Sequence, residues 1–255
     1  MTLTLTPLIN LPLVEPGDSL EEMLWSAILQ EHIRLESGDI LVLAQKIISK
    51  SEGRLVNLTQ VKPGKKALKL AEICHKDPRF VEMVLRESNR VLRKRVGTII
   101  VEHRLGFVCA NAGIDHSNVE GSWGNADDWV LLLPADPDAS AERIRHFIEE
   151  KAGIGIGILI IDSHGRAWRN GTVGISIGMS GVPGLVDLRG REDLFGFKLM
   201  ITQVGAADEL AAAASLVMGQ AGERIPAVHV RGFPYPLRKS TLTELIRPRE
   251  LDMFR

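Results

Sequence analysis

Apolar residues recur along this chain at two spacings, and each spacing predicts a different kind of element. A period near 3.6 marks helices. On the first predicted helix, the apolar residues that share one face are Leu20, Met23, Leu24, Ala27 and Ile28. Asp18, followed three residues later by Glu21, predicts the N-terminal cap of this helix. Further helices are predicted over residues 66–76, 79–94, 140–151 and 208–218. The last of these is stopped by Gly219.

Short apolar runs bounded by turn residues predict strands. The predicted strands cover residues 3–9, 40–44, 98–101, 107–110, 154–161, 173–177, 198–204 and 227–230. The run from Ile154 to Ile161 has the character of a buried central strand. A polar stretch from Glu120 to Asp128 predicts a surface loop. The basic cluster Arg90–Arg95 falls at the end of a helical pattern, which predicts a solvated helix end.

These elements together predict a mixed α/β (α+β) fold. No stretch is rich enough in Pro, Gly or Ser to separate domains, so residues 1–255 are predicted to form one unit. Its length also allows two lobes that the sequence does not separate. The two cysteines, Cys74 and Cys109, provide no disulfide framework or zinc spacing. Both lie in apolar surroundings and are predicted to be small core residues.

Charge and hydropathy exclude several classes of partner. The net charge is −1, so no overall field attracts nucleic acid or an anionic membrane. The longest apolar run, Ala152–Ile161, is too short to span a bilayer, and the N-terminus has no secretory pattern. These features predict a cytoplasmic protein.

Two aspartates carry the clearest chemical signal. Asp115 lies in NAGIDHSN, and Asp162 lies in IIDSHGRAWRNG; each follows an apolar strand. With Ser163 and Asn118 nearby in sequence, these carboxylates suit a hard divalent cation. Arg166 and Arg169, in the second segment, suit phosphate or carboxylate. A metal beside guanidinium groups points to phosphoryl chemistry. The alternative is that the aspartates only cap turns.

The familiar nucleotide-binding motifs are absent. No G-x-x-x-x-G-K-[ST] sequence occurs, because Thr59 stands where a P-loop before Gly64-Lys65 would need glycine. The glycines at 153, 155 and 157 lead into a strand instead of leaving one, so they do not form a dinucleotide fingerprint. They are predicted to permit close backbone packing.

Several longer segments occur together and in order. They are LPLV followed by ISKSEG, NAGIDHSN, IIDSHGRAWRNGTVGISIGMSG and LVMGQAGERIPAVHVRG. In this combination the chain resembles the coenzyme F420-0:L-glutamate ligases, which are GTP-dependent γ-glutamyl ligases. The resemblance runs from about Leu11 to the C-terminal end of the chain.

The resemblance implies a GTP site assembled from separated segments. Its residues would be Leu11, Pro12, Leu13, Val14, Gln45, Lys46, Lys50, Asn118, Ser215, Leu216, Val217, Met218, Gly219, Gln220, Ala221 and Gly222. Lys50 would contact phosphate as a point charge, and we also expect it to be a catalytic residue. LPLV would provide backbone amides and an apolar wall. Taken singly, each segment has an alternative reading: a strand end, a solvated lysine or a helix terminator.

By the same resemblance, Asp115 and Asp162 would be catalytic metal ligands for Mg²⁺ or Mn²⁺, with K⁺ as a further candidate ion. Ser163 and Gln220 would be additional metal ligands. Gln220 stands where archaeal members carry glutamate, and Gln45-Lys46 stands where they carry Ser-Thr, so these two contacts differ in detail. His116 and His164 are read as surface or outer residues, since hard metals favour oxygen.

The implied activity is ligation. GTP would phosphorylate the terminal carboxylate of coenzyme F420-0, and the amino group of L-glutamate would attack the acyl phosphate. Arg166 and Arg169 are candidates for holding the anionic substrate, and a homodimer is implied. Two other functions stay open on the residues alone: a metal-dependent phosphohydrolase and a non-catalytic deazaflavin-binding protein.

Overall fold

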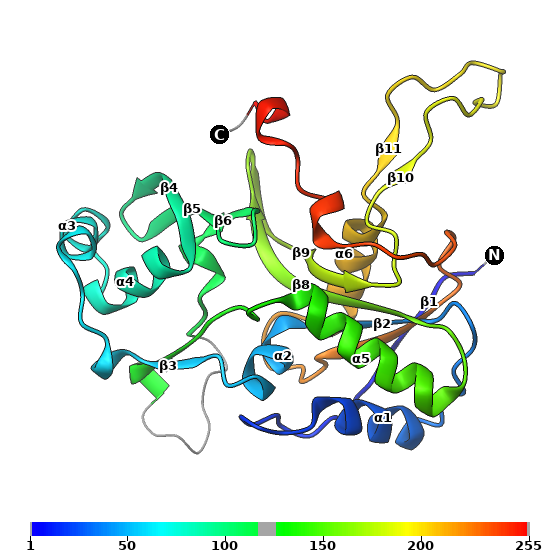
Figure 1. Cartoon of the computed structure of the whole chain (residues 1–255), viewed down its shortest axis with the longest axis horizontal. Coiled ribbons are helices and arrows are strands. Elements are labelled where there is room, and N and C mark those ends of the chain that lie inside the picture. The colour runs from blue at the N-terminus through cyan, green and yellow to red at the C-terminus, as the bar shows by residue number, and fades with distance from the viewer. Residues whose placement is uncertain (1, 117–125, 254–255) are drawn as a thin grey trace.

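A five-stranded sheet organises the larger part of the protein (Figure 1). The computed structural model describes residues 2–116 and 126–253. In sheet order, the strands are β1 (Thr4–Pro7), β12 (Ala227–Arg231), β2 (Ile40–Ala44), β8 (Gly157–Arg166) and β9 (Arg169–Ser180). β2 and β8 are parallel, and the other neighbouring strands are antiparallel. The mixed α/β prediction is confirmed.

Helices cover both faces of this sheet because its inner strands are apolar on both sides. Leu41, Leu43 and Ile158 face a cluster shared with α1 (Leu20–Gln30) and α5 (Pro137–Ala152). Their neighbours Val42 and Leu159 face a second cluster, shared with α6 (Ala206–Met218). The alternation therefore produces three layers. None of the helices in the described part of the chain is long and apolar enough to cross a bilayer.

A smaller lobe holds its own hydrophobic cluster. Its elements are α3 (Lys65–Cys74), α4 (Pro78–Arg86), β4 (Ser88–Arg95), β5 (Thr98–His103) and β6 (Val108–Ala110), with strand order β4-β5-β6. A two-stranded ribbon of β3 (Leu55–Asn57) and β7 (Trp129–Leu131) lies below α4 in Figure 1, and its Val130 belongs to the same cluster. Both cysteines are buried, as predicted. Burial raises the pKa of the Cys109 thiol to about 12.

The remaining elements are short. α2 (Gln45–Ser51) directly follows β2, and β10 (Val186–Asp187) pairs with β11 (Gln203–Val204) at the base of a long projecting arm (Figure 1). Single 3₁₀ turns occupy Leu58–Gln60, Asn111–Gly113, Ala126–Asp128, Leu242–Glu244 and Arg249–Leu251.

Three local predictions were wrong. The helix predicted over 79–94 ends at Arg86, because Gly97 (φ +80°) forms a turn that pairs β4 with the apolar strand β5. The Arg90–Arg95 cluster is therefore part of a strand. Residues 198–202 lie outside any strand, and only Gln203–Val204 pair. Asp18 does not cap α1; its carboxylate accepts the Glu15 amide instead (2.8 Å).

Close backbone packing, predicted for the glycines before β8, is found at Gly157. A Cβ there would lie 2.6 Å from Cγ2 of Val182, while Gly153 ends α5 in the left-handed region. A close approach between a helix and the sheet lies on β9. A Cβ on Gly174 would lie 2.6 Å from the backbone oxygen of Ala211 and 2.6 Å from Cβ of Ser215, both on α6.

We expect Gly174→Ala to push α6 off the sheet and to lower the free energy of unfolding by about 1–3 kcal/mol, the usual cost of overpacking. Gly165→Ala is the matched control on the same hairpin, because nothing lies within 4 Å of its added Cβ. Urea denaturation of both variants measures the difference. Equal stabilities would contradict the close α6–β9 packing.

Candidate functional site

A cavity of about 1410 Å³ lies where the pairing of β2 with β8 ends. These strands are parallel, and Ala44 is the register partner of Ile161. The next residues, Gln45 at the start of α2 and Asp162 within β8, consequently lie side by side where this pairing ends. Ligands in α/β proteins commonly bind at such an edge.

This cavity collects segments far apart in the sequence. The candidate site residues that line it are Leu11, Pro12, Leu13, Val14, Gln45, Lys46, Lys50, Asp115, Asp162, Ser163, Ser215, Met218, Gly219, Gln220, Ala221 and Gly222. The segments reach it from the loop after β1, from α2, from the end of the smaller lobe, from β8 and from the C-terminal end of α6. The tertiary structure thus brings together most of the residues selected from the sequence.

Asp115 is held by both its backbone and its side chain. Its amide donates to the carbonyl oxygen of Leu131 (3.0 Å), and its own carbonyl accepts the Leu131 amide (2.9 Å). Its carboxylate forms an ion pair with the Lys46 ammonium at 2.6 Å. The Asp115 and Lys46 side chains keep 27% and 28% exposure, so both remain within reach of a ligand.

Asp162 lies inside β8 and not in a loop after it, because β8 and β9 continue as a long hairpin to Arg166 and Arg169. Its carboxylate is 2.9 Å from Nε2 of His164, a buried residue whose ring contacts Phe107. His164 is therefore packed behind the aspartate and fixes its orientation.

A chain of hydrogen bonds ties the end of α6 to β8. The Ser163 hydroxyl donates to the Gln220 amide oxygen (2.8 Å), and the Gln220 amide nitrogen donates to the Ser215 hydroxyl (2.9 Å). Gly219 ends α6 with a positive φ of 72°. The backbone after α6 is thereby turned into the cavity, where small residues leave its amides accessible.

Lys50 reaches the cavity from α2, where it is half-buried. Burial lowers the pKa of its ammonium, the neighbouring Lys46 lowers it further, and Glu15 opposes both effects. Two lysines so close together favour an anionic ligand between them.

Some candidate residues lie elsewhere. Leu216 is 87% exposed and, like Val217, does not line the cavity. Arg166 and Arg169 are exposed register partners at the tip of the β8–β9 hairpin, also outside the lining. Asn118 lies outside the described residues.

The cavity also contains residues that the sequence did not single out. Arg224 and Glu223, beyond the LVMGQAG segment, line it together with Thr172 and Glu15. His116 lines it as well and stacks on Phe80 of the smaller lobe, with 5.4 Å between ring centroids. Glu223 and Arg224 lie inside the family segment LVMGQAGERIPAVHVRG, which was the one sequence signal that could have pointed to them.

The side chains at this edge offer the kind of ligand atom that a hard cation prefers. Asp115, Asp162, Ser163 and Gln220 all offer oxygen. The described residues contain no group of three or more His, Cys, Asp or Glu that would form a site by themselves. A cation here would therefore need further oxygens from a ligand such as phosphate.

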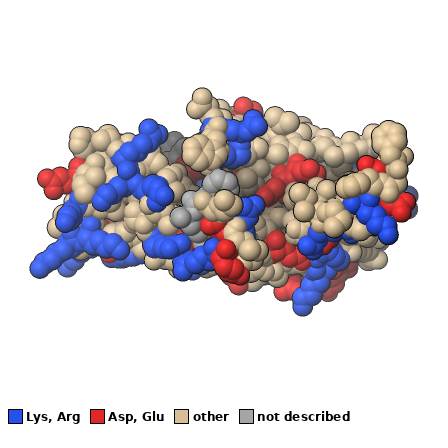
Figure 2. Space-filling view, turned by 90° about the horizontal axis from the view of Figure 1, so that it is seen from above, with Lys and Arg blue, Asp and Glu red and all other residues tan. Residues whose placement is uncertain are grey.

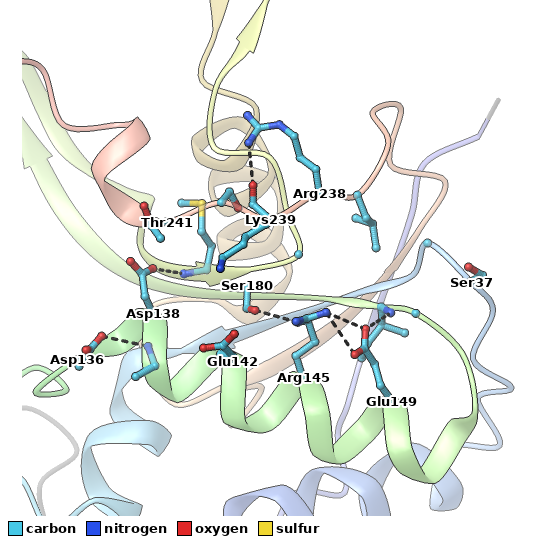
Figure 3. Close-up of a pocket in the computed structure, with 18 residues that line it drawn as sticks. Ser37, Asp136, Asp138, Glu142, Arg145, Glu149, Ser180, Arg238, Lys239 and Thr241 are labelled. Carbon is cyan, nitrogen blue, oxygen red and sulfur yellow. Dashed lines mark hydrogen bonds and ion pairs between the residues drawn. The ribbon is translucent and has the colours of Figure 1, made fainter.

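A second cavity of about 950 Å³ lies between α5 and residues 237–241 (Figure 3). Several of its charged groups already have ion-pair or hydrogen-bond partners in the protein. Arg145 donates to Ser180 (2.8 Å) and Glu149 (3.1 Å), and Arg238 pairs with Glu244 (2.6 Å). The half-buried Asp138 accepts the Met179 amide (2.8 Å). This mutual pairing makes the second cavity a weaker candidate for ligand binding.

Comparison with known proteins places the chain in a family. Residues 8–232 match the family model described as F420-0:Gamma-glutamyl ligase. The protein named coenzyme F420:L-glutamate ligase of Methanothermobacter thermautotrophicus is 44% identical, with 100% of both chains covered. The protein of the same name from Archaeoglobus fulgidus is 41% identical, with 100% of this chain and 97% of its own covered. The one from Methanocaldococcus jannaschii is also 41% identical, with 97% of this chain and 95% of its own covered. The chain belongs to the F420-0:gamma-glutamyl ligase family.

Proposed function

We propose that this protein is a GTP-dependent ligase that joins L-glutamate to coenzyme F420-0 and then adds γ-linked glutamate to the tail. Its relatives carry the name coenzyme F420:L-glutamate ligase. The observation that carries the proposal is the cavity at the ends of β2 and β8, which collects the separated candidate segments.

Nucleotide binding is proposed along two walls of this cavity. The segment Leu11–Val14 provides an apolar wall for a base, while Lys46 and Lys50 provide positive charge for phosphates. The backbone of residues 219–222 provides amides that small side chains leave uncovered. Gln45 lies buried beside Ala44 and shapes the floor between these walls.

A divalent cation, Mg²⁺ or Mn²⁺, is proposed to be held by Asp115 and Asp162, with Ser163 and Gln220 as further ligands. When bound, the cation supplies charge neutralisation for phosphate oxygens. The Lys46 ammonium, now paired with Asp115 at 2.6 Å, would then share its positive charge with the phosphate.

The proposed reaction has two steps. A carboxylate oxygen of the substrate attacks the γ-phosphorus of GTP, and GDP leaves. The glutamate nitrogen then attacks the acyl carbon, phosphate leaves, and the nitrogen loses a proton. Lys46 and Lys50 stabilise charge on the transferring group, and the rigid cavity walls align the reactants.

The anionic substrate needs a positively charged side chain at the cavity. Arg166 and Arg169, the first candidates, lie at the exposed hairpin tip. The proposal therefore assigns this contact to Arg224, which lines the cavity beside the loop after α6.

A homodimer is proposed from the projecting arm between β10 and β11. Its large apolar side chains are exposed: Leu194 96%, Phe195 93%, Phe197 64%, Met200 71% and Ile201 87%. An isolated arm with so much exposed apolar surface is typical of an interface. A second copy of the chain would cover it.

The activity is tested by incubating the protein with GTP, Mg²⁺ or Mn²⁺, L-glutamate and coenzyme F420-0. We expect one GTP consumed for each glutamate added, with product mass measured by mass spectrometry and phosphate release by a coupled assay. Equal GTP hydrolysis without glutamate would instead identify a phosphohydrolase. Binding of the deazaflavin with GTP left intact would identify a carrier protein.

Asp115→Asn and Asp162→Asn test the metal ligands. Each keeps the size of the side chain but removes a charge that a hard cation needs. We expect each to lower the ligation rate at least about a hundredfold, on the order of 3 kcal/mol, with partial recovery at higher Mg²⁺ or Mn²⁺. Glu15→Gln is the control, since it removes another carboxylate from the same cavity. Full activity in either aspartate variant would show that it is not a ligand.

The dimer is tested by Phe195→Ser combined with Ile201→Ser. We expect sedimentation velocity to show a dimer for the unmodified protein and a monomer for the double variant, because the apolar surface that drives association is removed. Leu68→Ser, an exposed leucine of α3 (50%), is the control and should stay dimeric. A monomeric unmodified protein would contradict the proposal.

A further inference from the structure

Positive charge is concentrated in the smaller lobe. Residues 58–113 contain twelve Lys and Arg but only five Asp and Glu, a net charge of +7, although the whole chain carries −1. Figure 2 shows Lys and Arg side chains gathered over the end of the molecule that holds α3, α4, β4 and β5. The overall net charge conceals this asymmetry.

Ion pairs inside the lobe do not neutralise it. Four of the five acidic residues already bind arginine: Asp77 to Arg79, Glu82 to Arg86, Glu87 to Arg104 and Glu102 to Arg90. Eight cations have no carboxylate within 4.0 Å among the residues that the structure describes. They are Lys62, Lys65, Lys66, Lys69, Lys76, Arg93, Lys94 and Arg95. All except the partly buried Lys76 are exposed.

Four of these cations form a path that begins at the cavity. His116 lines the cavity and stacks on Phe80, and the Lys76 ammonium lies 5.0 Å from the centroid of the same Phe80 ring. The amide of Gly97, in the β4–β5 turn, donates to the carbonyl oxygen of Cys74 (2.8 Å), close to Lys76 in the chain. This contact brings the turn that follows β4 to the end of α3, two residues before Lys76. We call Lys76, Arg93, Lys94 and Arg95 the basic strip.

We propose that the basic strip binds the γ-glutamyl tail of the substrate as the tail grows out of the cavity. This inference rests on the proposed function. Each addition converts one tail carboxylate into an amide and brings two new carboxylates, while the amine becomes uncharged. The tail therefore gains one negative charge per cycle. The growing negative charge of the tail is therefore complementary to the positive charge of the basic strip.

The strip acts by charge more than by shape. Exposed ion pairs are individually weak, and salt screens them beyond about 8 Å at physiological ionic strength. The strip lies beyond Phe80 as seen from the cavity, so we expect only a lengthened tail to reach it. The strip should therefore affect long tails and not the first addition, and its effect should fall with added salt.

Direct binding tests the strip without the ligation reaction. The probe is a fluorescently labelled tetra-γ-glutamate, titrated with the full-length protein and followed by anisotropy. We expect Lys76→Gln/Lys94→Gln/Arg95→Gln to bind it at least about threefold more weakly at low salt, a difference that disappears at high salt. Arg34→Gln/Lys151→Gln/Lys239→Gln removes the same charge from the larger part of the molecule and should bind like the unmodified protein.

Kinetics then separates this inference from the proposed function. In the strip variant we expect an unchanged rate for the first glutamate and a raised KM for precursors that already carry several glutamates. Equal behaviour of strip and control variants on long tails, in an active ligase, would overturn the strip alone. An unmodified protein that performs no ligation would overturn the proposed function, whatever the anisotropy shows. Tighter binding of an oligothymidylate of equal charge, abolished by the same variant, would assign the strip to nucleic acid instead.

Discussion

The parallel pairing of β2 with β8 is the constraint on which the rest of the site depends. It fixes Ala44 opposite Ile161, so that α2 leaves the sheet beside Asp162, while β8 continues in its pairing with β9. All other strand neighbours in this sheet are antiparallel. The parallel pair thus creates an edge where two chain segments diverge, and the cavity opens at that edge.

Close packing on the opposite side of the sheet completes the site. The absence of a side chain at Gly174 lets α6 lie directly on β9 at Ser215, whose hydroxyl accepts from Gln220 in the loop after the helix. Gln220 in turn accepts from Ser163 on β8. Tight helix–sheet contact and a short polar chain therefore hold the loop after α6 in one position, as a preorganised binding site requires.

The smaller lobe has a different physical character. Its core is formed by α3 and α4 on a three-stranded sheet, while its surface carries a large uncompensated positive charge. It reaches the cavity through the 3₁₀ turn Asn111–Gly113, Asp115 and His116. The two parts of the molecule thus contribute differently to the proposed function. The large sheet forms the cavity floor, and the lobe supplies one aspartate and a positive flank.

Local patterns determined much of this protein from the sequence. The helix face of α1, the apolar strands β2 and β8, the Ala-rich α6 with its stop at Gly219, and both buried cysteines follow from side-chain spacing and turn chemistry. The ordered family segments also indicated most residues of the cavity lining. These features depend on neighbours in the chain, which the sequence contains directly.

Tertiary structure decided what local patterns could not. The segment Ser88–Arg95 has a helical pattern but becomes a strand, because the turn at Gly97 offers it the apolar partner β5. Arg166 and Arg169 follow Asp162 closely in sequence, yet hairpin pairing carries them away from the cavity. Lys46 meets Asp115 although 68 other residues separate them in the chain. Such contacts arise from strand pairing and packing across long separations, which hydrophobic periodicity along the chain does not encode.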